Sequence, residues 1–167
     1  MITIKQSNII DLKTDAIVNA ANEHLWSGGG VCGAIFAAAG PTELAEACRK
    51  IGHCDTGKAV ITDGFALCKY IIHAVGPIYV DGEHNEAELL YSCYQEALNL
   101  AKEYKCRSVG FPIISSGIYA YPSKQAWQVA IKAITDWQDI NSNDIEIIFA
   151  VLEKQDKDLG LEVINNM

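Results

Sequence analysis

Two stretches of this chain place glycines and small polar residues where a main chain can bind phosphate. The first reads DAIVNAANEHLWSGGGVCGAIFAAAG and runs from Asp15 to Gly40. Its apolar start at 16–18 is typical of a buried strand, its glycines at 28–30 allow close approach to the main chain, and its alanine-rich end is typical of a helix. Because the first-turn amides of such a helix have no partner within it, the stretch predicts an anion site.

The second stretch, FPIISSGIYAYP, runs from Phe111 to Pro122 and has the same order of strand, small-residue loop and helix. In an open α/β sheet, two loops at the carboxyl ends of strands can face one crevice. Successive amides at 116–118 can form a nest for a second phosphate, and two such loops suit a pyrophosphate better than a single phosphate. The simpler interpretation is that the glycines only make turns and the alanines only pack a helix.

Two other glycine motifs do not have the setting that their chemistry requires. Gly28, Gly30 and Gly33 have the spacing G-x-G-x-x-G, but they do not follow their strand at once, and a second helix follows Gly40. The sequence GHCDTGK at 52–58 matches most of a P-loop, yet it precedes a strand and lacks the Ser or Thr that holds magnesium. We therefore expect neither a dinucleotide fold nor a P-loop, and 52–58 is predicted to be a turn.

The composition excludes several classes of protein. The chain has 167 residues, half of them hydrophobic, and a net charge of −8. This acidic balance argues against generic binding to nucleic acid, which needs clustered Lys and Arg. The sequence contains no apolar run of the ~20 residues that a membrane span requires. Since the first residues do not resemble a signal peptide, we expect a cytoplasmic protein, with a monomer favoured.

The cysteines and histidines give weaker signals. The six cysteines lack CxxC spacing and are predicted to be reduced thiols. A zinc site built from His53 and Cys54 with Cys48 or Cys68 is a minor alternative, because the ligand spacing is absent. No cofactor and no metal are predicted. His73 lies inside a predicted strand, where we expect a packed structural histidine.

The elements that must position the two loops follow from hydrophobic periodicity. Strands are predicted at 2–6, 16–18, 58–62, 70–75, 108–112 and 145–152, and helices at 31–39, 41–51, 86–104, from 122 onward, and at 155–165. This alternation predicts an α/β sandwich with helices on both faces of the sheet. We expect the first strand at an edge, and the short N-terminal strands favour a mixed sheet.

Taken together, several segments resemble the macro domain family, and within it the MacroD-like branch. They are DAIVNAAN at 15–22, GGGV-GAI-AAG at 28–40, TGKAVIT at 56–62, YIIHAVGP at 70–77 and FPIISSGIYAYP at 111–122. The resemblance implies a three-layer α/β/α sandwich with a mixed, mostly parallel central sheet, forming a single macro domain over residues 1–167. It also implies that ADP-ribose or ADP-ribosylated protein is the partner. Many MacroD-like members hydrolyse ADP-ribose from acidic side chains or deacetylate O-acetyl-ADP-ribose.

The resemblance also implies roles for individual residues. Asn22 matches the asparagine that holds the distal ribose hydroxyls, with the capping of a turn as the simpler alternative. Tyr119 is expected to cover that ribose, and Ile9 to offer its amide to adenine. The expected ligand contacts are Asn8, Ile9, Ala21, Asn22, Gly29, Gly30, Val31, Cys32, Ser115, Ser116, Gly117, Ile118, Tyr119 and Leu152.

Three positions depart from the family pattern. Asn8 stands where an Asp usually accepts a hydrogen bond from adenine, and Leu152 where an aromatic ring usually stacks on it. Cys32 replaces the Asp that activates water in MacroD-like hydrolases, and Phe36 replaces the usual histidine. A thiol at a helix N-terminus can react as a thiolate, but a neutral thiol is a poor base.

Two functions therefore stay open for the chain. In the first, the protein hydrolyses ADP-ribosyl esters, with Asn22 and Cys32 as the candidate catalytic residues and a water positioned by the bound ligand. In the second, it is a reader that binds ADP-ribose without turnover, because Cys32 replaces the catalytic Asp. We expect the hydrolase, with the reader as the alternative.

Overall fold

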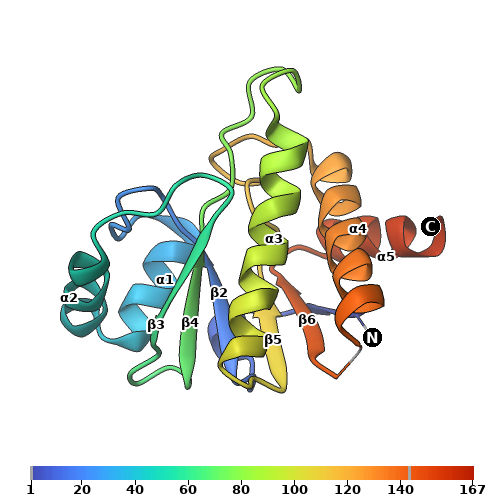
Figure 1. Ribbon diagram of the computed structural model, residues 1–167. Coiled ribbons are helices and arrows are strands. Elements are labelled where there is room, and N and C mark those ends of the chain that lie inside the picture. Colours follow the sequence, from blue (N-terminus) through green and yellow to red (C-terminus); the bar gives the residue numbers. More distant parts are fainter. Residues whose placement is uncertain (1, 143) are drawn as a thin grey trace.

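The computed structural model describes residues 2–142 and 144–167 and contains a central six-stranded sheet with helices packed on both faces (Figure 1). The strands are β1 (Ile2–Gln6), β2 (Ala16–Ala20), β3 (Ala59–Asp63), β4 (Tyr70–Ala74), β5 (Ser108–Phe111) and β6 (Glu146–Val151). The helices are α1 (Gly30–Ala39), α2 (Pro41–Ile51), α3 (Glu86–Glu103), α4 (Ser123–Asn141) and α5 (Lys154–Asn165), with a short 3₁₀ turn η1 (Ile9–Asp11). Each predicted element is present, with ends shifted by two residues or fewer.

The strand order is β1-β6-β5-β2-β4-β3, which puts β1 at an edge as predicted. The sheet is mixed, and five of its strands run parallel to one another. The antiparallel strand is β3, which pairs with β4 across a short connection, as only antiparallel neighbours can. The predicted mixed, mostly parallel sheet is confirmed, but its antiparallel strand is β3 and not a strand at the N-terminus, because β1 pairs parallel with β6.

Alternation along the buried strands separates two hydrophobic cores. In β2, Ala16 and Val18 face one layer of helices, whereas Ile17 faces the other. The first core contains apolar residues of α3, α4 and α5, such as Leu90, Trp127 and Val163. The second core contains apolar residues of α1 and α2. Helices therefore cover both faces of the sheet, and the three-layer α/β/α prediction is confirmed.

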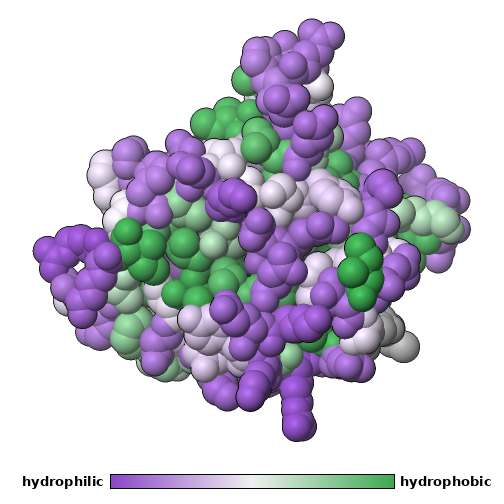
Figure 2. Space-filling view, viewed as in Figure 1, coloured by the Kyte–Doolittle hydropathy of each residue, from purple (hydrophilic) through white to green (hydrophobic). Residues whose placement is uncertain are grey.

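The two longest helices, α3 and α4, pack against each other on one face of the sheet (Figure 1). Their apolar stripes are buried, and the view in Figure 2 shows hydrophilic residues over much of this side of the molecule. Within residues 2–142 and 144–167, none of the helices is both long enough and apolar enough to cross a lipid bilayer.

The sheet has a topological switch point beside β2. Its neighbours are β4 and β5, and all three strands are parallel. After β2 the chain enters α1 on one face, and after β5 it enters α4 on the opposite face. The loops that follow β2 and β5 therefore start side by side at the carboxyl ends of these strands and run to opposite faces of the sheet. Open α/β sheets form a ligand crevice at such a point.

Candidate functional site

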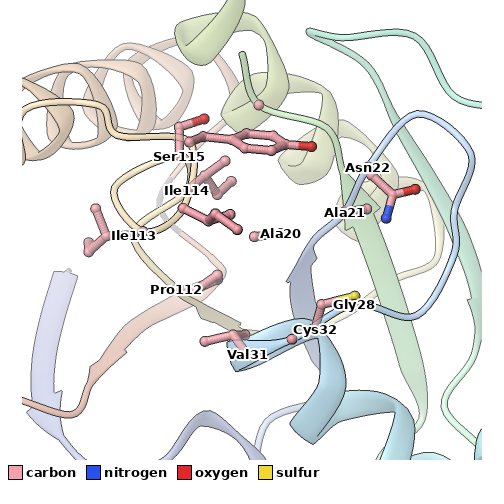
Figure 3. Close-up of a pocket in the computed structure, with 16 residues that line it drawn as sticks. Ala20, Ala21, Asn22, Gly28, Val31, Cys32, Pro112, Ile113, Ile114 and Ser115 are labelled. Atoms are coloured by element: carbon pink, nitrogen blue, oxygen red, sulfur yellow. The ribbon is translucent and has the colours of Figure 1, made fainter. Parts of the chain in front are cut away.

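A cavity of about 400 Å³ lies at this switch point, between the loop after β2, the loop after β5 and the first turn of α1 (Figure 3). Its wall is formed by Ala20, Ala21, Asn22, Gly28, Gly29, Gly30, Val31, Cys32, Gly76, Pro112, Ile113, Ile114, Ser115, Gly117, Ile118 and Tyr119. In the part of the chain that the structure describes, no Lys, Arg, Asp or Glu lines it. An anion in this cavity would therefore be bound by main-chain N–H groups and neutral side chains.

The first wall is shaped by glycines and by the start of α1. Gly29 precedes the helix in an extended conformation, with no side-chain cap on the first-turn amides. Gly30 has a φ of +59°, which favours glycine. A Cβ on Gly33 would lie 2.5 Å from the Gly28 carbonyl oxygen, so only glycine lets the loop pack this closely against the helix. The amides of Gly30, Val31 and Cys32 are therefore available at the positive end of the helix.

The second wall is fixed by hydrogen bonds to side chains of the scaffold. The Ile114 N–H donates to the buried Tyr94 hydroxyl at 3.0 Å, and the Ser115 hydroxyl donates to the Pro77 carbonyl at 2.8 Å. The Tyr121 N–H donates to the Ser115 carbonyl at 2.9 Å and closes the loop. Among the described residues, none accepts a hydrogen bond from the main-chain N–H groups of 116–118. These amides are therefore unpaired in the described chain at the position where the sequence predicts a second anion cradle.

Asn22 lies on the cavity wall and also closes a turn. Its Nδ2 donates to the Trp26 carbonyl at 2.9 Å, and its Oδ1 accepts from the Trp26 N–H at 3.1 Å. The capping interpretation of Asn22 therefore describes part of its role. Because the side chain lines the cavity as well, a ribose hydroxyl would compete with Trp26 for the same amide.

Cys32 also lies on the wall, in the first turn of α1 (Figure 3). It is 8% exposed, and its Sγ donates to the Trp26 carbonyl at 3.7 Å. In this contact the sulfur faces a main-chain carbonyl, so the arrangement does not direct a base at a bound water. Phe36, one turn further along the helix, is buried in the core.

The predicted contacts divide into two groups. The structure brings together Ala21, Asn22, Gly29, Gly30, Val31, Cys32, Ser115, Gly117, Ile118 and Tyr119 around the cavity. Asn8, Ile9, Ser116 and Leu152 are not among the residues that line it. Asn8 caps η1 by accepting from the Ile10 N–H at 3.2 Å, Ile9 is buried, and Leu152 is exposed. Asn8 and Leu152 follow the paired parallel strands β1 and β6, so both lie at the carboxyl ends of the strands, as the cavity does.

Sequence reasoning missed several residues of the wall: Ala20, Gly28, Gly76, Pro112, Ile113 and Ile114. Ala20, Gly76 and Pro112 stand at or just beyond the carboxyl ends of β2, β4 and β5. Since these three parallel strands are neighbours, their ends meet at one edge. For Gly76, the available sequence signal was the Gly-Pro pair that follows the strand in the segment YIIHAVGP.

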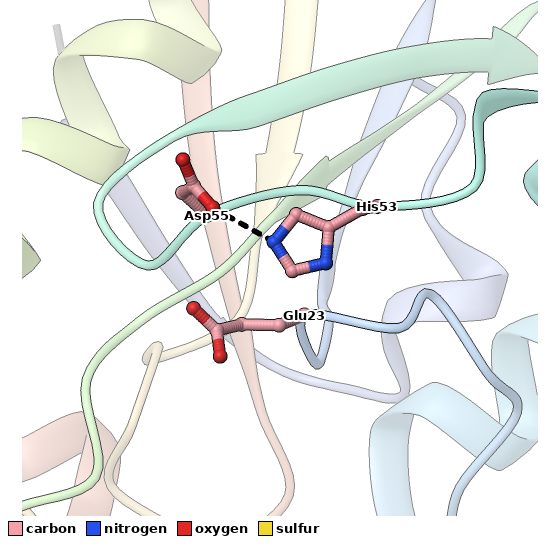
Figure 4. Close-up of side chains that lie close together, drawn as sticks. All are labelled: Glu23, His53 and Asp55. Atoms are coloured by element: carbon pink, nitrogen blue, oxygen red, sulfur yellow. Dashed lines mark hydrogen bonds and ion pairs between the residues drawn. The ribbon is translucent and has the colours of Figure 1, made fainter.

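A polar cluster lies on two loops that meet near Asn22. Oxygens of Glu23 and Asp55 and a ring nitrogen of His53 lie within 4.8 Å of one another, and the His53 Nε2 is 2.7 Å from Asp55 Oδ1 (Figure 4). These are donor atoms that Zn²⁺ accepts, but all three residues are exposed. Glu23 already accepts two hydrogen bonds from Thr56, so we assign no ion to the cluster.

The alternative zinc set is not assembled in residues 2–142 and 144–167. Cys48 Sγ lies 3.9 Å from His73, Cys54 Sγ 3.8 Å from the Asp55 carbonyl and Cys68 Sγ 3.1 Å from the Tyr70 carbonyl. Burial raises the pKa of each of these three thiols to about 11. They are therefore protonated at neutral pH when no ion is bound.

His73 is a packed structural residue, as the sequence predicts. It is fully buried in β4, where Nδ1 lies 3.1 Å from the Asn19 Nδ2 and Nε2 lies 3.0 Å from the Thr62 hydroxyl. This pattern fits a neutral ring that accepts at Nδ1 and donates at Nε2. Burial lowers the pKa of His73 to about 4, so the ring stays neutral at physiological pH.

The fold and the cavity define a three-layer α/β/α domain with two amide-lined loops at its topological switch point. The chain belongs to the macro domain family, since the family model "Macro domain" matches residues 18–130. A macro domain-containing protein from Chlorobaculum tepidum is 48% identical over 155 residues, which cover 92% of this chain and 90% of that protein.

Two further similarities bear on the branch of the family. Human ADP-ribose glycohydrolase MACROD2 is 46% identical over 160 residues, covering 93% of this chain and 37% of that protein. A solved structure of an Oceanobacillus iheyensis macrodomain mutant with ADP-ribose has a TM-score of 0.91 at 36% identity, covering 99% of this chain and 91% of that one. The chain therefore belongs to the MacroD-like branch that its motifs indicate.

Proposed function

We propose that this protein binds ADP-ribose, free or attached to protein, in the cavity between the two loops. One observation carries the proposal: two sets of main-chain amides without partners in the described chain face one cavity that has no charged side chain in its wall. Two such cradles match a diphosphate, because the oriented N–H dipoles of each cradle can bind one phosphate group. The ADP-ribose in the Oceanobacillus macrodomain structure supports the same ligand.

The rest of the ligand follows the edge of the sheet. Asn22 binds the distal ribose hydroxyls, and Tyr119 covers that ribose. The adenine end extends toward Asn8, Ile9 and Leu152, which follow β1 and β6 at the same edge. The Asn8 oxygen has a second lone pair beyond the one that caps η1, so it can still accept from the adenine amino group.

The reaction that we propose is hydrolysis of ADP-ribosyl esters, on mono-ADP-ribosylated Asp or Glu or on O-acetyl-ADP-ribose. The bound ligand positions a water against the distal ribose, and the amide cradles orient the diphosphate beside it. The name of the human relative, an ADP-ribose glycohydrolase, supports this chemistry. Without an Asp at the position of Cys32, orientation of the water supplies most of the rate enhancement.

The second candidate is a reader that binds ADP-ribose without turnover. The contact of Cys32 with the Trp26 carbonyl favours it, because a sulfur that is paired with a main-chain carbonyl is not placed to accept a proton from water. In either case we propose a single macro domain over residues 1–167 that acts as a cytoplasmic monomer. The net charge of −8 supports the absence of generic binding to nucleic acid or anionic membranes.

Calorimetry with ADP-ribose tests the binding proposal directly. We expect saturable binding of ADP-ribose, weaker binding of ADP, and much weaker binding of AMP, which cannot occupy both cradles. Inorganic phosphate serves as the control for nonspecific anion binding. Absence of ADP-ribose binding at millimolar concentration would end the proposal.

A time course with mono-ADP-ribosylated protein at stoichiometric enzyme separates the hydrolase from the reader. We expect release of ADP-ribose above the spontaneous rate. Cys32→Asp restores a base and should raise the rate by about tenfold or more, whereas Cys32→Ser should not. Release at only the spontaneous rate would favour the reader, and an unchanged rate in Cys32→Asp would show that this position does not govern water activation.

A further inference from the structure

One buried carboxylate lies outside the cavity and organises a loop beside it. Glu86, the first residue of α3, is 1% exposed. Its Oε2 accepts from the N–H groups of Val80, Asp81 and Gly82 at 2.9, 3.1 and 3.0 Å. Its Oε1 accepts from the His84 N–H at 2.6 Å. A single side chain therefore holds four main-chain groups of the 77–85 loop, which is the larger part of the segment between β4 and α3.

The carboxylate of Glu86 stays charged although it makes no salt bridge to Lys, Arg or His in the described chain. Burial raises the pKa of Glu86, but the four N–H donors more than offset this and lower the pKa to about 2. The side chain is thus built to bind main-chain N–H groups, and its position at the helix N-terminus also suits a negative charge.

The 77–85 loop has little packing of its own. Ile78 and Val80 are 63% and 65% exposed, and the tip of the loop extends beyond the end of α3 (Figure 1). Asp81 and His84 pair with each other at 2.8 Å on this exposed tip. With few buried side chains in the loop, its shape depends on the Glu86 carboxylate.

The same loop is attached to the second wall of the cavity. The Tyr79 N–H donates to the Tyr119 carbonyl at 2.9 Å, and Tyr119 lines the cavity. The Ser115 hydroxyl donates to the Pro77 carbonyl at 2.8 Å, and the Tyr79 and Tyr121 rings lie 4.9 Å apart. The connection from the carboxylate to the wall is therefore short. Glu86 fixes the Val80 N–H, and the adjacent Tyr79 N–H fixes Tyr119.

We propose that Glu86 is a positioning residue for ligand binding, which holds the 77–85 loop so that Tyr79 fixes Tyr119 against the distal ribose. The identity of the ligand rests on the proposed function. Glu86 does not touch the ligand, and it acts through the main chain of residues 79–80.

A cation site is the competing interpretation of this region, because ligand atoms of Asp81, His84 and Glu86 lie within 4.8 Å of one another. Both Glu86 oxygens already accept hydrogen bonds, and Oε2 accepts three. A cation would have to displace these N–H groups and leave them without a partner beside a buried charge. The geometry therefore favours a loop anchor.

Glu86→Gln tests the proposal, with Glu88→Gln as the matched control because Glu88 is exposed in the same turn of α3. The glutamine amide directs its own N–H groups at main-chain donors, so the loop should loosen. We expect the Kd for ADP-ribose to rise about tenfold, while the Kd for ADP, which lacks the distal ribose, should change less than about threefold. Hydrogen exchange should accelerate at 79–84 and 116–121 and nowhere else.

The outcomes separate the proposal from a purely structural role. Equal losses of ADP and ADP-ribose binding, or exchange that accelerates throughout the chain, would overturn it, as would wild-type behaviour of Glu86→Gln. If Glu86→Gln does not fold, Gly82→Ala strains the same loop at a φ of +83° while the Glu86 side chain is kept, and the same split in affinity is expected. Should the wild-type protein not bind ADP-ribose, the proposed function fails, and the exchange measurement alone decides whether Glu86 holds Tyr119.

Discussion

The two walls of the cavity reach the same end by different means. The first wall exposes amides because side chains are missing: a Cβ at Gly28, Gly29 or Gly30 would meet no other atom of the described chain. The second wall exposes amides because buried side chains, such as Tyr94, hold the loop around them in place. The first wall is therefore specified locally, and the second depends on residues far away in the sequence.

This contrast predicts where mutations act. Ligand binding at the first wall should be sensitive only to substitutions in the wall itself. Ligand binding at the second wall should also be sensitive to substitutions of the distant residues that support it. Variants at Gly117, Tyr94 and Asn22 test this difference, and a variant at His73 tests a buried position away from both walls.

Gly117→Val should have the largest effect on binding. A Cβ at Gly117 has open space around it, so the folded protein should tolerate valine within about 0.5 kcal/mol. The side chain fills the cradle at 116–118, and ADP and ADP-ribose should both bind about 100-fold more weakly, which corresponds to about 2.7 kcal/mol. Calorimetry and urea unfolding measure the two quantities. Undiminished binding would remove these amides from the ligand site.

Tyr94→Phe should destabilise the second wall by removing a hydroxyl group that supports its loop. The change leaves the buried Ile114 N–H without its acceptor, which costs about 2 kcal/mol of unfolding free energy. Tyr91→Phe on the same helix is the control, because its hydroxyl pairs with Asp136 nearer the surface and its loss should cost under about 1 kcal/mol. Equal costs measured by urea unfolding would show that Tyr94 does not support the loop.

His73→Gln should change the pH dependence of the free energy of unfolding. His73 lies on the face of the sheet that carries α1 and α2. The pKa of His73 is lowered from 6.5 to about 4, so unfolding takes up a proton below pH 6.5. Its contribution to stability is complete above pH 6.5 and falls as the pH drops toward 4. Between pH 7 and 5 this linkage amounts to about 2 kcal/mol. Urea unfolding at both pH values should show that the variant loses about that much less, and equal losses would contradict the buried neutral ring.

Asn22→Ala should have the smallest effect of the four. We expect about tenfold weaker binding of ADP-ribose, or about 1.4 kcal/mol, and unchanged binding of ADP. Asn8→Ala, at the adenine end, should instead weaken both ligands alike. Loss of the Trp26 turn should also alter tryptophan emission. An Asn22→Ala variant that keeps wild-type affinity for ADP-ribose would exclude the ribose role.

Much of the fold could be predicted because its signals are local. The apolar runs at 16–18 and 70–75 predict strands, and the alanine-rich run before Gly40 predicts α1. The direction of β1 was not predictable from its own residues, because Ile2–Gln6 pairs with β6 at the other end of the sequence. Strand direction depends on the partner, and a single short strand does not specify one.

The site shows the same division between local and distant signals. Asn22 and the glycines at 28–30 stand out because their residue types suit a phosphate loop. Gly76 joins the wall only because β4 lies beside β2, and the support from Tyr94 depends on α3 packing under the loop. The four hydrogen bonds that Glu86 accepts from main-chain N–H groups require one particular loop conformation. No residue pattern at 77–85 predicts that conformation.

The absence of Lys and Arg from the described cavity wall has a kinetic consequence. The molecule as a whole is strongly negative, so its long-range field opposes an approaching dianion, and attraction begins only within the short reach of the amide dipoles. Added salt screens that repulsion, so capture of a nucleotide diphosphate should become faster as ionic strength rises. Proteins that attract phosphates with basic patches show the opposite trend.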